Sequence, residues 1–238
     1  VVNHVLSMML ILATAGHVPE AISNLQRVRH LLDQCDDTAT VARFWQWLGR
    51  FGIEGRQPTS LCIQALRRSA AMFEGLGNQR HVHACRRMIA EAMMRSGDLS
   101  QARAELALAE ALEVPGSPAA DRMRRLRVAG LIADAEDRPD DALRLIHHAL
   151  DIAEAYDIQR YCLMLMADLG WVQLRAGRFE RASACLLALL DRMEPGSREG
   201  LIRAHALAGL IVALLATDAV DEAIRLAPAA INALRDCG

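Results

Sequence analysis

Three side chains that commonly bind transition metals lie close together at His81-x-His83-x-Cys85. Imidazole nitrogen and thiolate sulfur are ordinary ligands of zinc. On a helix, however, positions 81 and 85 share one face, whereas His83 points to the other side. His147 and His148 are adjacent and diverge on a helix as well. We therefore expect no metal site, and we interpret these histidines as solvent-facing or helix-capping residues.

Paired carboxylates, which in other settings do acid–base chemistry, occur at Asp36-Asp37 and Asp140-Asp141. Both pairs fall at expected helix starts, where the helix dipole favours negative charge, so they need no catalytic role. No grouping of Ser, His and Asp is accompanied by a motif such as GxSxG. We expect no catalytic residue and no cofactor, and we predict that the chain is not an enzyme.

The cysteines argue for a reducing compartment. They are dispersed without a CxxC pair, so neither a zinc framework nor a secreted disulfide scaffold is indicated. Their positions are Cys35, Cys62, Cys85, Cys162, Cys185 and Cys237. We interpret them as small buried apolar residues of a cytoplasmic protein.

The apolar segments of the sequence are expected to be helices of the repeat rather than targeting or membrane segments. Residues 1–15 are apolar but lack a basic segment and a starting Met, and the apolar run 207–216 is too short to cross a bilayer. We therefore expect no membrane contact. The missing Met, together with residues 236–238 arriving directly after an expected helix, predicts a fragment of a larger protein.

The composition favours packed helices over a sheet. Of 238 residues, 53% are hydrophobic and only 4% aromatic, and Ala and Leu dominate. All 27 basic residues are Arg, yet the formal net charge is −2. Because the chain lacks the positive charge of a nucleic-acid binder, we expect no direct contact with nucleic acid.

A small residue returns about every forty positions, which indicates a repeated helical hairpin. The slots hold Ala21, Leu61, Ala102, Ala142, Ala182 and Ala223. Five residues before each slot stands a residue suited to a turn, namely Gly16, Arg56, Gly97, Asp137, Gly177 or Asp218. One hairpin cannot bury its own apolar face, so repeats of this kind stack into a solenoid. The fold class predicted is all-α, an α-α superhelix of about six hairpins.

Helix-breaking and turn-forming residues indicate where the helices and the repeats begin and end. One solenoid domain is expected over 1–238, with repeats at 1–36, 37–76, 77–116, 117–157, 158–196 and 197–238. The expected helix pairs are 2–15 with 18–33, 38–54 with 58–74, 79–96 with 99–113, 118–136 with 139–155, 159–176 with 179–193, and 198–216 with 219–236. Pro19, Pro58, Pro118 and Pro139 are expected in the first turn of a helix.

Each of these recurring small residues should lie where the two helices of a hairpin cross, because a bulky side chain there would push the backbones apart. Leu61 breaks the pattern, so we expect repeat two to be splayed or shifted. Its first helix carries Trp45, Trp47 and Phe51, which we expect to fill the wider gap.

The spacing of Gly and Ala resembles the tetratricopeptide repeat. The motifs are Trp45-x-x-Leu48-Gly49, Leu169-Gly170 followed by Gly177-x-Phe179-x-x-Ala182, and Gly97-x-Leu99-x-x-Ala102. The ordinary repeat of that family has about 34 residues. HEAT and armadillo arrays have periods nearer forty but lack this spacing, so the tetratricopeptide resemblance is favoured.

Extended repeats of this period, rich in Ala, Leu and Arg, resemble the sensor region of large ATP-dependent LuxR-type transcriptional regulators of the maltose-activator kind. In that family a nucleotide-binding module precedes the solenoid and a helix-turn-helix follows it. Similar arrays accompany bacterial adenylate cyclases, kinases and peptide-responsive regulators. The resemblance implies a bacterial ligand- or protein-binding module, and a stand-alone adaptor that holds a partner's peptide or helix is the alternative.

The tetratricopeptide resemblance also implies a binding groove, since in that family the first helix of each hairpin lines the concave wall. Carried onto this sequence, the groove positions are Arg43, Gln46, Arg50, Arg87, Glu91, Met94, Arg124, Arg127, Trp171 and Arg175. Six of these ten are Arg, whose planar fork suits carboxylate or phosphate. The expected ligand is an anionic or polyhydroxylated small molecule, or a protein or peptide. The alternative is that Arg only solvates exposed helix faces.

The first and last helices are apolar over much of their circumference, which predicts burial on more than one side. The residues are Val5, Leu6, Met8, Met9, Leu10, Ile11 and Leu12 in the first helix, and Ala223, Ile224, Leu226, Ala227, Ala230, Ile231 and Leu234 in the last. In the isolated chain these faces are expected to pair with another copy, giving a homo-oligomer.

Overall fold

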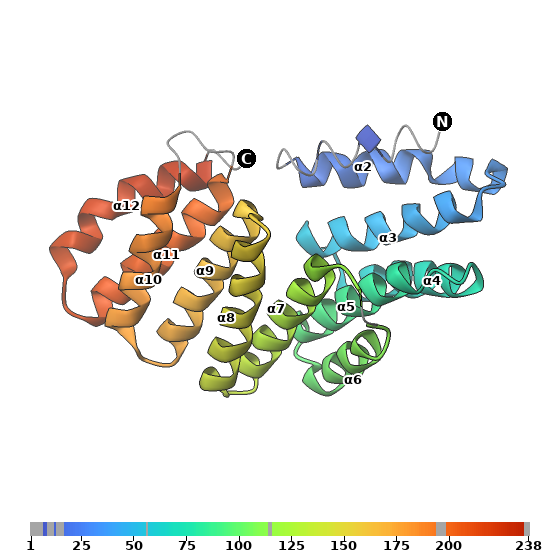
Figure 1. The fold of residues 1–238 in the computed structure, drawn as a ribbon. Helices are drawn as coiled ribbons and strands as arrows, with labels where there is room; N and C mark the ends of the chain where they lie inside the picture. Colours follow the sequence, from blue (N-terminus) through green and yellow to red (C-terminus); the bar gives the residue numbers. More distant parts are fainter. Residues whose placement is uncertain are drawn as a thin grey trace. The chain divides into compact units, whose positions relative to one another are not determined.

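The helices of this protein follow the predicted pairs closely. The computed structural model describes residues 7, 8, 12, 17–55, 57–113, 116–193 and 199–235. These residues form helices and no strand (Figure 1). The elements are α2 (Val18–Val28), the 3₁₀ helix η1 (Arg29–Gln34), α3 (Thr38–Glu54), α4 (Thr59–Gly75), α5 (Gln79–Arg95), α6 (Leu99–Glu110), α7 (Ala119–Ala135), α8 (Pro139–Ala155), α9 (Gln159–Arg175), α10 (Phe179–Arg192), α11 (Gly200–Ala216) and α12 (Val220–Arg235).

The all-α repeat fold is confirmed. Each predicted helix from 38–54 onward matches an observed one to within three residues at its described ends. The predicted helix 18–33 is divided into α2 and η1, and the predicted helix 2–15 lies almost wholly outside the described residues.

The chain forms two compact units, residues 1–117 and 118–238. The division falls beside the predicted boundary between repeats three and four. Inside each unit every helix packs on the helix before it and the helix after it, as in a stack of hairpins. A single solenoid over all six repeats stays a prediction.

The turns inside the hairpins use the left-handed backbone that the sequence pattern requires. Gly97 and Gly177 have φ of 85° and 70°, and Asp137 and Asp218 reach 59° and 62°. Glycine adopts this region without a steric penalty, and Asp is one of the few other residues that tolerates it. Gly16 and Arg56 lie outside the described residues.

The small slots are buried at the hairpin crossings, with one correction. Ala21, Ala102, Ala142 and Ala182 are 0% exposed, and Ala223 is 3% exposed. Leu61 is 57% exposed, so the prediction that it occupies the slot in repeat two was wrong.

Cys62, 3% exposed, fills that slot instead. The reason is the length of the turn: four residues separate α3 from α4, whereas three separate α5 from α6, α7 from α8 and α9 from α10. The extra residue moves the register of α4 by one. Repeat two is therefore not splayed, since a Cβ added at Gly49 of α3 would lie 2.5 Å from Leu66 Cγ of α4.

The aromatic residues of α3 pack against the preceding helix, α2. Trp45 and Phe51, 6% and 0% exposed, pack with Ala21 and Leu25 of α2 in one core cluster, and Trp47 lies at its edge. They therefore pack against the preceding helix, and the same cluster includes Ala65 of α4 within repeat two.

Two of the four prolines also differ from the prediction. Pro19 and Pro139 lie in the first turn of α2 and α8, as expected. Pro58 and Pro118 instead occupy the N-cap positions of α4 and α7, with extended ψ angles of 124° and 131°. Asp37 caps α3 by accepting a hydrogen bond from the Ala39 amide at 3.0 Å.

The register of α4 gives a direct prediction. Cys62→Leu should lower the free energy of unfolding by roughly 1–3 kcal/mol, because the larger side chain overpacks the crossing. Leu61→Ala should change it by no more than about 0.5 kcal/mol. Urea denaturation followed by circular dichroism measures both. Equal effects of the two changes would show that the assigned register is wrong.

Candidate functional site

The ten predicted groove residues all lie on first helices of hairpins, and we call them the first-helix wall. In the unit formed by residues 1–117, α3 carries Arg43, Gln46 and Arg50, and α5 carries Arg87, Glu91 and Met94. In the unit formed by residues 118–238, α7 carries Arg124 and Arg127, and α9 carries Trp171 and Arg175. The two parts of the wall are described separately below.

On α3 and α5, Gln46 is a structural link and not an available surface group. It is only 9% exposed. Its Nε2 donates to Cys85 Sγ at 3.4 Å and to the His81 carbonyl at 3.5 Å, so it ties α3 to α5. The next first helix therefore covers most of Gln46, and its place in a binding groove stays a prediction.

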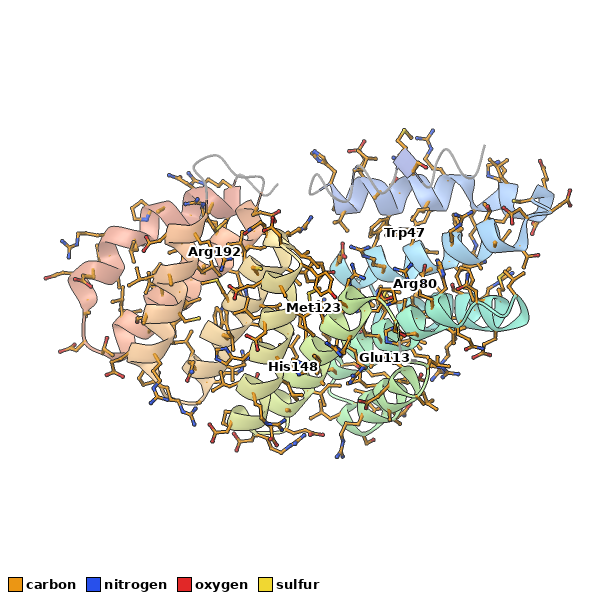
Figure 2. All side chains as sticks on the ribbon, viewed as in Figure 1. Trp47, Arg80, Glu113, Met123, His148 and Arg192 are labelled. Atoms are coloured by element: carbon orange, nitrogen blue, oxygen red, sulfur yellow. The ribbon has the colours of Figure 1, made fainter. Side chains whose placement is uncertain are left out.

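An aromatic and cationic group forms at the end of α3. Trp47, labelled in Figure 2, stacks on Phe51 with ring centroids 5.2 Å apart. The Arg50 guanidinium lies 5.0 Å from the centre of the Trp47 ring, and Arg50 Nε donates to Glu54 Oε1 at 3.0 Å. The pairing with Glu54 and the ring contact hold this half-exposed guanidinium in one place.

Glu91 of α5 forms ion pairs with two arginines of the same helix. It lies 2.8 Å from Arg95 Nη2 and 3.9 Å from Arg87 Nη1. Arg95 also donates to the Ile53 carbonyl of α3 at 3.0 Å, which makes a second link between these first helices. Arg95 was not among the predicted residues.

On α7 and α9, arginine and aspartate pair across the helices. Arg127 of α7 binds Asp168 of α9 with both ends of its fork, at 2.6 and 3.3 Å. Arg175 of α9 pairs in turn with Asp134 of α7. Two oppositely directed ion pairs thus join the same two helices.

Arg124 of α7 completes this row. Its Nε donates to the Tyr161 hydroxyl of α9 at 2.9 Å, and its Nη1 lies 3.2 Å from Asp121 Oδ1. The guanidinium also lies 5.2 Å from the centre of the Tyr161 ring. Arg124 is one-third exposed, so one side of the group remains open to a ligand.

Trp171 of α9 is a half-buried aromatic residue of the wall. Its ring stacks on His205 of α11 with centroids 4.8 Å apart and planes 15° apart, and its Nε1 donates to the His205 carbonyl at 3.3 Å. Partial burial lowers the pKa of His205, with the nearby Asp168 acting in the opposite direction. The imidazole therefore stays neutral at neutral pH.

The charge of the wall is balanced. Five of its six arginines make ion pairs with carboxylates, and Arg43 donates to the Thr40 hydroxyl at 3.2 Å. These ion pairs therefore offset much of the positive charge that six arginines suggest, and four of the five carboxylates are at most 13% exposed.

The residues that pair with the arginines and with Trp171 of α7 and α9 were not predicted from the sequence, although the spacing of two pairs indicates them. These residues are Tyr161, Asp121, Asp134, Asp168 and His205. Arg127 and Asp168, and likewise Asp134 and Arg175, are 41 positions apart, which is one repeat. Opposite charges separated by one period predict a contact between equivalent helices.

The histidine and cysteine motif of α5 is dispersed by the helix, as predicted. His81 Nδ1 lies 3.1 Å from the side chain of Asn78, the N-cap of α5. His83 is not solvent-facing, because it is 4% exposed and its Nε2 lies 3.2 Å from Glu113 Oε1. Cys85 is buried. The described residues contain no group of three His, Cys, Asp or Glu side chains placed to hold a metal ion.

A cavity of about 580 Å³ lies away from the wall. Ser60, Gln64 and Arg67 of α4 line it, together with Met93 of α5 and Gln101 of α6. None of the predicted groove residues reaches it. Across the described part of the chain, no helix combines the length and the apolar character needed to span a bilayer.

Comparison with solved structures fits this arrangement of helices. NprR in complex with its cognate peptide NprX superposes with a TM-score of 0.75 at 13% identity, over 98% of this chain and 66% of that chain. A Rap protein complexed with competence and sporulation factor gives 0.75 at 15% identity, over 97% and 66%. A kinesin light chain of Podosopora anserina with nearly identical TPR-like repeats gives 0.55 at 14% identity, over 80% and 93%.

The fold is a tetratricopeptide-like helical solenoid. Identities this low show the fold alone. No protein-family model matches the sequence, and no curated protein matches it. The chain spans just under two thirds of the length of the NprR and Rap chains.

Proposed function

We propose that this chain is a non-enzymatic module that binds a peptide along the part of the first-helix wall that α7 and α9 form in the unit of residues 118–238. The observation that carries the proposal is the row of alternating Arg and Asp on α7 and α9, bordered by the half-buried ring of Trp171. NprR and the Rap protein superpose on nearly all of this chain; NprR was solved with its cognate peptide NprX and the Rap protein with competence and sporulation factor.

Guanidinium groups held in fixed positions suit an extended peptide. Each peptide unit presents a C=O acceptor. The open guanidinium edges of Arg124 and Arg175 can donate to such carbonyl groups, while Asp121 and Asp134, 10% and 8% exposed, hold those guanidinium groups in place. Trp171 adds a rigid ring for an apolar or aromatic side chain, which is the kind of residue that dominates binding energy.

The finer role that we propose is the sensor region of a bacterial transcriptional regulator of the LuxR type, acting in the cytoplasm. Peptide binding would favour one stacking of the hairpins and shift the population towards it. A stand-alone adaptor that holds a partner's peptide accounts for the same wall equally well. The neighbouring coding sequence separates the two: a phosphate-loop module upstream and a helix-turn-helix downstream support the regulator.

Peptide binding can be tested without knowing the natural peptide. A library of random seven-residue peptides is selected on the immobilised chain, and enriched peptides are measured by fluorescence anisotropy. Trp171→Ala and Arg175→Ala should each weaken binding roughly tenfold or more, as expected for interface anchors. Tyr156→Ala is the matched control, because Tyr156 is 66% exposed at the end of α8, outside the wall.

Two results would contradict the proposal. One is that no peptide is enriched over an unrelated helical protein. The other is that enriched peptides bind the wall variants as tightly as the unchanged chain. Inorganic phosphate and maltose, tested in the same assay as competitors, probe the alternative that the wall takes an anionic or polyhydroxylated small molecule.

A further inference from the structure

The outer face of α12 carries an apolar stripe with the spacing of a helix-pairing seam. Its members follow one another at intervals of four, three, four and three residues: Val220, Ile224, Ala227, Ile231 and Leu234. Four of them are strongly exposed, Val220 at 42%, Ile224 at 64%, Ile231 at 48% and Leu234 at 56%. This spacing keeps one side of a helix turned towards a partner helix along its whole length.

Several of the same helix positions are covered elsewhere in this unit. In α8 the second and third positions of the stripe are Leu143 and Ile146, which are 8% and 0% exposed and share a core cluster with α9. In α10 the third position is Leu186, which is 0% exposed and clusters with α11. The stripe on α12 is therefore a surface of the type that a neighbouring helix covers within the stack.

Helix α11 also carries exposed apolar residues. Leu201, Val212 and Leu215 are 70%, 46% and 52% exposed. Helices α11 and α12 pack side by side, as the orange and red ribbons of Figure 1 show. Large apolar side chains exposed on two neighbouring helices indicate an interaction surface.

The charges that flank the stripe indicate what covers it. Asp221 and Arg235 are exposed and lie 14 residues apart, so they occupy the same flank of α12 at opposite ends. If a second α12 lies antiparallel on the first, Asp221 of each copy faces Arg235 of the other. A two-fold axis makes this contact twice, as a self-complementary interface requires.

We propose that α12 pairs antiparallel with α12 of a second copy of this chain, with α11 widening the contact on both sides. The interface consists of the apolar stripe at the centre and two Asp221–Arg235 ion pairs at the ends. This pairing is independent of peptide binding, because the wall residues on α7 and α9 do not belong to it.

Sedimentation equilibrium on the 238-residue chain from about 1 to 100 μM tests the pairing. The unchanged chain should be dimeric in the upper part of this range. Ile231→Glu should raise the dissociation constant at least about tenfold, because it places a charge at the centre of an apolar contact. Ala229→Glu is the control on an exposed side of α12 outside the stripe and should leave it unchanged.

Charge exchange tests the antiparallel geometry itself. Asp221→Arg and Arg235→Asp should each weaken the dimer about fivefold, since each change replaces two attractive contacts by repulsive ones. The double change, Asp221→Arg with Arg235→Asp, should restore the affinity of the unchanged chain. Circular dichroism confirms that every variant stays folded.

A chain that remains monomeric at 100 μM would overturn the proposal. A dimer whose affinity the Ile231→Glu change leaves unaltered would overturn it as well. Failure of the double change to restore affinity would exclude antiparallel pairing through α12.

Discussion

Arg127→Met should lower the free energy of unfolding by about 3 kcal/mol, in the range observed when one partner of a buried ion pair is removed. The side chain of Asp168 is only 10% exposed and lies 2.6 Å from Arg127 Nε. Without Arg127, Asp168 keeps a charge that water reaches poorly. Urea denaturation followed by circular dichroism measures the loss.

Two further variants show whether the pair acts as a unit. Adding Asp168→Leu to Arg127→Met should recover most of the lost stability, because replacing both partners removes the uncompensated charge. Arg144→Met is the matched control, since Arg144 pairs with Asp141 on the surface with 71% of its side chain exposed. That change should cost no more than about 0.5 kcal/mol. Equal losses at Arg127 and Arg144 would show that the ion pair between α7 and α9 contributes no more to the free energy of unfolding than a surface ion pair.

Leu186→Ala should destabilise the second unit by about 2–5 kcal/mol, the cost of a cavity left by a fully buried leucine. Leu186 is 0% exposed, and a Cβ added at Gly170 would lie 2.5 Å from its Cδ2. A Cβ added at Gly209 would lie 2.9 Å from its Cδ1, so the same side chain packs against α9 and α11. Thermal and urea unfolding both report the change.

The neighbouring residue supplies the control. Leu187 is 48% exposed, and Leu187→Ala should alter stability by no more than about 0.5 kcal/mol. Gly170→Ala should destabilise the unchanged chain but much less so the Leu186→Ala variant, because the smaller side chain leaves room for the new methyl group. Independent, additive effects at Gly170 and Leu186 would contradict the close approach of α9 and α10.

The site was predictable in location but not in electrostatic character. Because each hairpin has a first and a second helix, the wall residues could be assigned from the repeat alone. Which residues pair could not be, because Asp168 and Asp134 are buried partners only once α7 and α9 lie side by side. Gln46 shows the same limit, since its burial comes from α5, a helix one repeat further along the chain.

The sequence by itself determined the helices, their pairing into hairpins and the period of the stack. These depend on local preferences and on apolar spacing, which each segment carries regardless of its neighbours, as the left-handed Gly97, Asp137, Gly177 and Asp218 show. The tertiary structure decided the register of α4, where one extra turn residue exchanges Leu61 for Cys62 in the crossing, because a shift of one residue turns a helical side chain by about 100°. It also decided the balanced charge of the wall, because ion pairs between helices form only where packing brings the side chains within reach.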